Sequence, residues 1–157
     1  MVFCVVKTLS LVNFTGINLR IMERRILATA AFLGMTGIIL GAFGAHGLKK
    51  IVEPESVAVF ETGVRYHIYH AFFLLFIGSS AFVTAKAKKT IFILTIIGTL
   101  FFSGSIYLLA LNAKLPFDFR PFGWITPIGG LLLILAWAVL FLNIVRKKHK
   151  CYMRYLK

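Results

Sequence analysis

Three histidines and their polar neighbours are the side chains of this sequence best suited to chemistry. His67 and His70 are three residues apart in the run Arg65-Tyr66-His67-Ile68-Tyr69-His70, so on a helix they share one face. His46 ends an earlier apolar segment. If the two segments form a helical hairpin, we expect the Cα atom of His46 within about 10 Å of that of His67 or His70.

Three imidazoles allow several kinds of chemistry. They could bind zinc or copper, and a histidine pair on two helices could hold haem. Histidine and tyrosine near a membrane surface more often hydrogen-bond backbone carbonyls and lipid headgroups, and we favour that interpretation. We therefore predict no metal site and no cofactor. A metal- or haem-binding protein that uses His46, His67 and His70 stays the second alternative.

Two further pairs have spacings that allow an interaction. Glu61 and Arg65 are four residues apart with the acid first, the favourable order for a helical ion pair, and Arg65 could equally bind a lipid phosphate. Ser103 and Ser105 could act as nucleophiles beside a histidine, but hydroxyls in apolar helices usually serve packing. We predict a non-enzymatic protein without catalytic residues. The candidate binding residues are His46, Glu61, Arg65, Tyr66, His67, Tyr69 and His70.

The segments that must position these residues are long and apolar. Of the 157 residues 59% are hydrophobic, which is typical of a membrane protein. Four segments match the thickness of a bilayer, at about 26–45, 66–85, 91–111 and 124–145. The sequence thus predicts an all-α membrane protein, a bundle of four transmembrane helices within residues 22–146.

The first connector is expected to hold a short amphipathic helix. Pro54 suits the first turn of a helix, and Val57, Phe60 and Val64 beyond it fall on one stripe. We expect either a surface helix or a solvated extension of the second transmembrane helix.

Small residues predict where the helices pack closely. Gly34, Gly37, Gly41 and Gly44 recur at helical spacing and form a ridge on the first segment. In lipid, such ridges let neighbouring helices approach. The full set of predicted packing residues is Gly34, Gly37, Gly41, Gly44, Ser103, Gly104, Ser105, Gly129 and Gly130.

The basic residues predict the orientation in the membrane. The net charge of +13 comes from cations clustered at the ends of the apolar segments, which indicates topology rather than nucleic-acid binding. Thirteen Lys and Arg residues fall on the side of both termini and the loop at 86–89, and five fall on the other side. Both termini are therefore expected in the cytoplasm, with lipid as the main partner and a second copy or another membrane protein as a further one.

The two ends of the chain differ from its centre. Residues 1–21 form an N-terminal extension that lacks the layout of a signal peptide, and Met22 directly precedes Arg24 and the first apolar segment. We expect translation to start at Met22. Residues 147–157 form a basic cytoplasmic tail.

Four ordered motifs carry a family resemblance over residues 22–146. They are Gly-Ala-Phe-Gly-Ala-His-Gly-Leu at 41–48, Phe-Glu-Thr-Gly-Val-Arg-Tyr-His at 60–67, Phe-Ser-Gly-Ser-Ile-Tyr at 102–107 and Ile-Thr-Pro-Ile-Gly-Gly at 125–130. Together they resemble the YgdD/YwdK-like family of small bacterial inner-membrane proteins, which has eukaryotic relatives. The resemblance implies four spans and an inner-membrane location but no activity. We expect a protein that binds lipid headgroups or a partner; the first alternative is a small transporter or channel component.

Overall fold

The computed structural model describes the backbone of residues 2–155 and the side chains of residues 19–146. Every long element within them is a helix, and they contain no strand. The bounds are α1 (Val2–Ala42), α2 (Pro54–Ser79), α3 (Ala85–Ala110) and α4 (Ile125–Tyr155). A π-helical turn and a 3-10 turn continue α1 to Lys50. The side chains of residues 1–18 and 147–157 lie outside the described part, so the N-terminal extension, the start at Met22 and the basic tail stay predictions.

Three stretches of the described chain are long and apolar enough to cross a membrane: Leu19–Lys50, Ala85–Ala110 and Arg120–Arg146. The helical prediction is confirmed, whereas the count of four transmembrane helices is supported only for these three. α2 has the length but not the composition, since Glu55, Glu61 and Arg65 lie in its first half and His67 and His70 just beyond its middle.

The first connector contains no separate amphipathic helix, so the surface-helix form of the prediction is wrong, and the stretch is an extension of the second helix, as the other form expected. Pro54 begins α2, which runs without a break to Ser79, so the amphipathic stretch is the first part of a long helix. Its stripe of Val57, Phe60 and Val64 is buried, because these side chains pack with Leu48 from the turn after α1.

The second helix also ends earlier than the predicted limit at residue 85. Ser80 adopts an extended backbone, and α3 begins at Ala85. The side chain of Thr84 caps α3 by accepting a hydrogen bond from the amide of Ala87, and a hydroxyl at this position stabilises a helix start. The predicted end of the second helix therefore belongs to a loop and to the first residue of α3.

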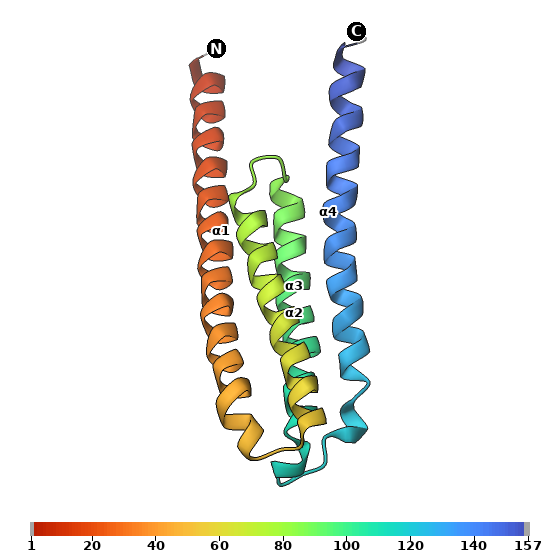
Figure 1. Cartoon of the computed structure of the whole chain (residues 1–157). Helices are drawn as coiled ribbons and strands as arrows, with labels where there is room; N and C mark the ends of the chain where they lie inside the picture. Colours follow the sequence, from red (N-terminus) through yellow and green to blue (C-terminus); the bar gives the residue numbers. More distant parts are fainter. Residues whose placement is uncertain (1, 156–157) are drawn as a thin grey trace.

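The four helices form an antiparallel row in the order of the chain (Figure 1). α1 packs on α2, α2 on α3 and α3 on α4, whereas α1 and α4 form the two flanks. Three apolar clusters fill the row from end to end. The cluster near the first connector contains Phe60 and Val64. Two more clusters lie near the loop between α2 and α3. One contains Ile26 and Leu74, and the other contains Ile77 and Ile91.

The predicted glycine ridge contacts α2 at three of its four positions. A Cβ atom at Gly37, Gly41 or Gly44 would meet the side chains of Ile68, Val64 and Phe60, respectively, whereas one at Gly34 would meet no atom within 4 Å. These contacts define the antiparallel register of the two helices. The number of a residue on α1 and the number of the α2 residue that faces it add to about 105.

α3 and α4 approach most closely at Gly129. A Cβ atom there would overlap the backbone of Phe101 and Phe102, and one at Gly130 would touch the Phe102 ring. Gly104, by contrast, faces open space. Gly63, Gly78 and Gly98 also lie against side chains of neighbouring helices, although the sequence analysis did not select them.

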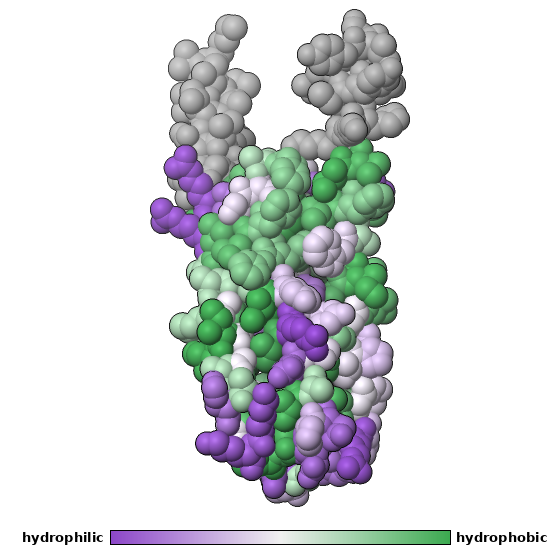
Figure 2. Space-filling view, viewed as in Figure 1, coloured by the Kyte–Doolittle hydropathy of each residue, from purple (hydrophilic) through white to green (hydrophobic). Residues whose placement is uncertain are grey.

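Apolar side chains cover much of the surface that Figure 2 shows, and hydrophilic ones gather toward the end with the connectors before α2 and α4. Large exposed hydrophobic residues include Ile38, Phe72, Leu100, Ile134 and Phe141. A surface of this kind fits contact with lipid tails, because in water it would promote association.

Candidate functional site

His67 connects three helices. Its Nε2 atom lies 3.2 Å from Oγ1 of Thr36 on α1, and its Nδ1 atom lies 3.3 Å from the hydroxyl of Tyr107 on α3. The Thr36 hydroxyl donates its own proton to the carbonyl of Phe32, so it accepts from His67 Nε2–H. In the neutral ring Nδ1 is then the acceptor, and the Tyr107 hydroxyl donates to it.

His70 lies one turn further along α2 and is also buried. Its Nδ1 atom is 2.7 Å from the carbonyl oxygen of Tyr66, and because a carbonyl can only accept, Nδ1 carries the proton. The neutral ring therefore keeps Nε2 as an acceptor, and no described residue donates a hydrogen bond to that atom.

α3 carries a row of three buried hydroxyls. Thr95, Thr99 and Ser103 are spaced four residues apart, each is at most 4% exposed, and none of their hydroxyl oxygens has a hydrogen-bond partner. Ser105 differs, because its hydroxyl lies 2.7 Å from Oγ1 of Thr126 and joins α3 to α4.

His46 does not join His67 and His70, which corrects the predicted cluster of three histidines. His67 bonds Thr36, and a helix rises about 1.5 Å per residue, so His46 lies about 15 Å further along the axis from that contact. The register of α1 on α2 places His46 near Ala58 instead. In the described part of the chain no three His, Cys, Asp or Glu side chains gather at one point. A metal site that uses all three of these histidines therefore has no support in the described part of the chain.

Arg65 does not form the predicted ion pair with the carboxylate of Glu61. Its guanidinium donates 3.4 Å to the backbone carbonyl of Glu61 and 3.2 Å to the hydroxyl of Thr62. Tyr66 and Tyr69 are exposed beside it, on the outside of α2. The guanidinium thus keeps a charge that no described carboxylate neutralises.

A groove of about 300 Å³ lies between α1 and α2 next to Arg65. Gly41, Gly44, Phe60 and Val64 form its apolar part, and Glu61 and Arg65 line it as well. The groove exists because glycines on α1 leave space where larger side chains would fill the contact.

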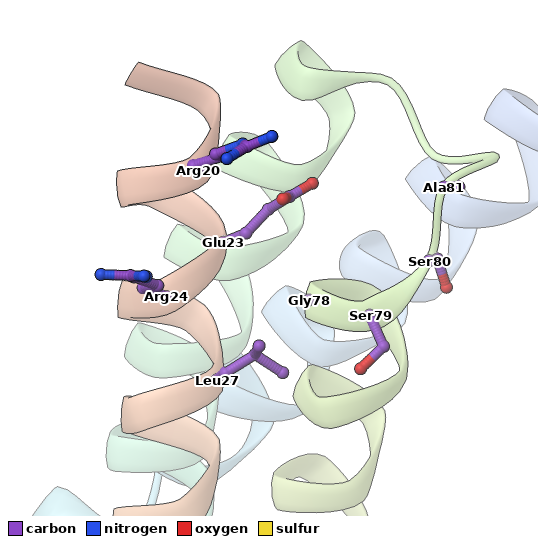
Figure 3. A pocket seen from close by; sticks show the side chains of 8 residues that line it. All are labelled: Arg20, Glu23, Arg24, Leu27, Gly78, Ser79, Ser80 and Ala81. Atoms are coloured by element: carbon purple, nitrogen blue, oxygen red, sulfur yellow. The ribbon is translucent and has the colours of Figure 1, made fainter. Parts of the chain in front are cut away.

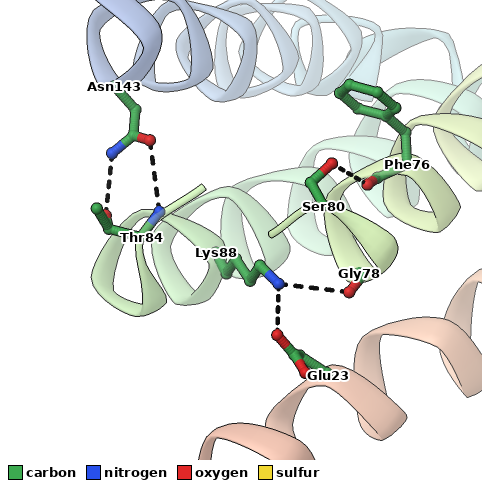
Figure 4. Close-up of polar contacts among 7 residues, drawn as sticks. All are labelled: Glu23, Phe76, Gly78, Ser80, Thr84, Lys88 and Asn143. Atoms are coloured by element: carbon green, nitrogen blue, oxygen red, sulfur yellow. Dashed lines mark hydrogen bonds and ion pairs between the residues drawn. The ribbon is translucent and has the colours of Figure 1, made fainter. Parts of the chain in front are cut away.

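The opposite end of the row holds a charged contact that the sequence analysis missed. Lys88 is 2% exposed, and its Nζ atom lies 2.6 Å from Oε1 of Glu23 and 3.4 Å from the carbonyl of Gly78 (Figure 4). Nearby, Asn143 of α4 accepts a bond from the amide of Thr84 and donates one to its hydroxyl. These contacts tie the loop between α2 and α3 to both flanking helices.

A pocket of about 390 Å³ lies beside this ion pair, between the end of α2 and α1. Glu23 and Leu27 line it, and the Arg24 side chain extends away from α2 (Figure 3). Since Lys88 already neutralises Glu23, Arg20 and Arg24 give this end a positive charge.

Apolar helices, a lipid-facing surface and polar groups enclosed between helices are features of integral membrane proteins. The comparisons with known proteins agree. The family model described as "Protein of unknown function (DUF423)" matches residues 40–130. A UPF0382 membrane protein of Haemophilus influenzae is 36% identical over 74% of this chain and 90% of the relative. The UPF0382 inner membrane protein YgdD of Escherichia coli K12 is 31% identical over 82% of this chain and 95% of the relative.

The chain is therefore an integral membrane protein of the DUF423 family, and the resemblance to YgdD-like proteins is confirmed. No solved structure matches it significantly.

Proposed function

We propose that this chain is a non-enzymatic protein of the bacterial inner membrane that crosses the bilayer four times with both termini in the cytoplasm. The 26 residues of α2 span about 39 Å, which is enough to cross a bilayer. Its low hydropathy comes partly from His67 and His70, which are buried between helices and so do not face lipid. The name of the Escherichia coli relative supports the inner-membrane location.

Reporter fusions after Lys50, after Ala81 and at the C-terminus test this topology. Four spans place Lys50 outside and the other two positions in the cytoplasm. If α2 does not cross, Lys50 and Ala81 report the same side and the C-terminus reports the opposite side from the N-terminus.

As its activity we propose binding of a phospholipid headgroup at the groove between α1 and α2. The observation that carries this proposal is the Arg65 guanidinium, which stands beside an apolar groove and has no carboxylate partner among the described residues. A guanidinium binds phosphate oxygens well, and the glycine-lined part of the groove can accept the start of an acyl chain.

Native mass spectrometry of the protein in detergent with added phosphatidylglycerol tests the activity. We expect Arg65→Gln to reduce the bound lipid several-fold, whereas Arg120→Gln serves as the control because it removes a cation on the same side but away from the groove. Equal lipid binding by the two variants would contradict the proposal.

A small transporter or channel component is the second candidate, favoured by the buried hydroxyls of α3. Polar groups without partners in a membrane protein often line the path of a polar solute. Flux of small solutes into liposomes containing the purified protein, compared with protein-free liposomes, separates this candidate from the first.

A further inference from the structure

The hydroxyl row of α3 lies at the same depth as the two buried histidines. Gly63 of α2 contacts Ile106 and Tyr107, and the rings of Tyr66 and Phe102 lie 4.7 Å apart, so residue numbers of α2 and α3 add to about 169. This register puts Ser103 level with His67 and Thr99 level with His70. Thr95 follows one turn further, level with Leu74.

Apolar layers close both ends of this polar section. Phe60, Val64 and Ala110 belong to the buried cluster toward the first connector. Ile77 and Ile91, one turn beyond Leu74 and Thr95, are fully buried in the cluster toward the loop between α2 and α3. The polar groups are therefore separated from both aqueous sides by hydrophobic side chains.

Water can form hydrogen bonds to the unused polar groups of this section and so bridge them. Three hydroxyls are available as donors and acceptors, and His70 Nε2 is available as an acceptor. A buried hydroxyl without a partner costs about 1–3 kcal/mol, whereas a buried water typically forms about three hydrogen bonds to such groups. No charged side chain of the described chain lies at this depth, so an uncharged occupant fits best.

We propose that Thr95, Thr99 and Ser103 of α3, together with His67 and His70 of α2, form an enclosed binding site for water in the middle of the membrane domain. The site is independent of the proposed headgroup site, which lies between α1 and α2. An enclosed hydrated section between two apolar layers is also what a polar solute would need midway through the protein.

Solid-state NMR of labelled protein in proteoliposomes detects the water directly. We expect magnetisation from water to reach the side chains of Thr99 and Ser103 several-fold faster than that of Ile91, which is equally buried on the same helix. Transfer to all three at the slow rate of Ile91 would overturn the proposal.

Replacement of the hydroxyls gives a second, independent measurement. If water bridges them, Thr95→Val and Thr99→Val remove hydrogen bonds and lower the thermal midpoint in detergent by a few degrees. If the section is dry, valine removes an unsatisfied hydroxyl and the midpoint rises, which contradicts the proposal. Thr90→Val is the matched control, because its hydroxyl is exposed on the same helix and bonds the carbonyl of Lys86; its midpoint should not change.

Discussion

At the scale of single residues, Lys88 has the least exposed charge among the side chains that the structure describes. An ammonium group taken out of water is costly unless a carboxylate and further acceptors surround it. Glu23 and the carbonyl of Gly78 provide both, so this ion pair joins α1 to α3 beside the end of α2.

We expect Glu23→Ala to destabilise the protein by about 3 kcal/mol, because it leaves the Lys88 charge buried without a partner. The double variant Glu23→Ala with Lys88→Met should recover most of this loss, since it removes both charges. Unfolding in mixed micelles measures the two free energies. A double variant no more stable than the single one would show that the pair does not govern the stability of this end.

At the scale of elements, the glycines differ in how closely they let a neighbouring helix approach. Gly129 leaves no room for a side chain against the backbone of α3, whereas Gly104 faces open space. At Gly129 the backbone of α4 thus lies against the backbone of α3, which no residue with a side chain permits.

Gly129→Ala should destabilise the protein by more than about 2 kcal/mol, because the added methyl group forces α4 away from α3. Gly104→Ala provides the control with the same chemical change, and here the better helix propensity of alanine should leave stability unchanged or raise it by up to about 1 kcal/mol. Thermal unfolding in detergent compares them. Similar losses in both variants would contradict a specific contact at Gly129.

The connector between α3 and α4 is organised by Asp118. Its carboxylate accepts hydrogen bonds from the backbone amide of Arg120 and the side chain of Asn112, and these donors lower the pKa of Asp118 below its ordinary value. A lowered pKa in the folded state means that the stabilisation is present above the unfolded value and lost as the pH falls through the folded value.

We therefore expect the amides of residues 112–123 to be protected from exchange at pH 5 and to lose protection as the pH falls through the lowered pKa of Asp118 and its carboxylate takes up a proton. Protection factors corrected for the intrinsic pH dependence of exchange provide the measurement. Asp118→Asn should abolish this change. Protection that stays unchanged while Asp118 takes up its proton would exclude control by this side chain.

At the scale of the whole molecule, much of the architecture follows from the sequence. Long apolar segments predict the helices, and the spacing of Gly37, Gly41 and Gly44 predicts one face of α1 that contacts α2. The sequence could not predict the register, since a ridge of glycines allows several, and the grouping of His46 with His67 failed for that reason. The sequence did not predict the Lys88–Glu23 pair, because its partners are 65 residues apart. Both also lie in basic segments at the ends of apolar helices, where charges usually indicate orientation in the membrane.

The sequence also did not predict which helices lie next to one another. Each helix packs on the next in the chain, so α1 and α4 flank an open row instead of closing a ring. The exposed apolar side chains of Met35 on α1 and Ile128 on α4 fit this arrangement, because both are free to contact lipid.

Disulfide crosslinking in a variant with Cys4 and Cys151 replaced by serine tests the open row. The residues at 41 and 64 on α1 and α2, and at 105 and 126 on α3 and α4, lie in contact, so cysteines at each pair should crosslink at monomer mass. The third pair, at 35 and 131, lies at one depth according to the successive registers, since residue numbers of α3 and α4 in contact add to about 231, but on the two flanks. We expect no crosslink within the monomer for this pair. Efficient crosslinking at 35 and 131 would instead indicate a closed bundle, in which α1 covers α4 and all four helices surround the polar section.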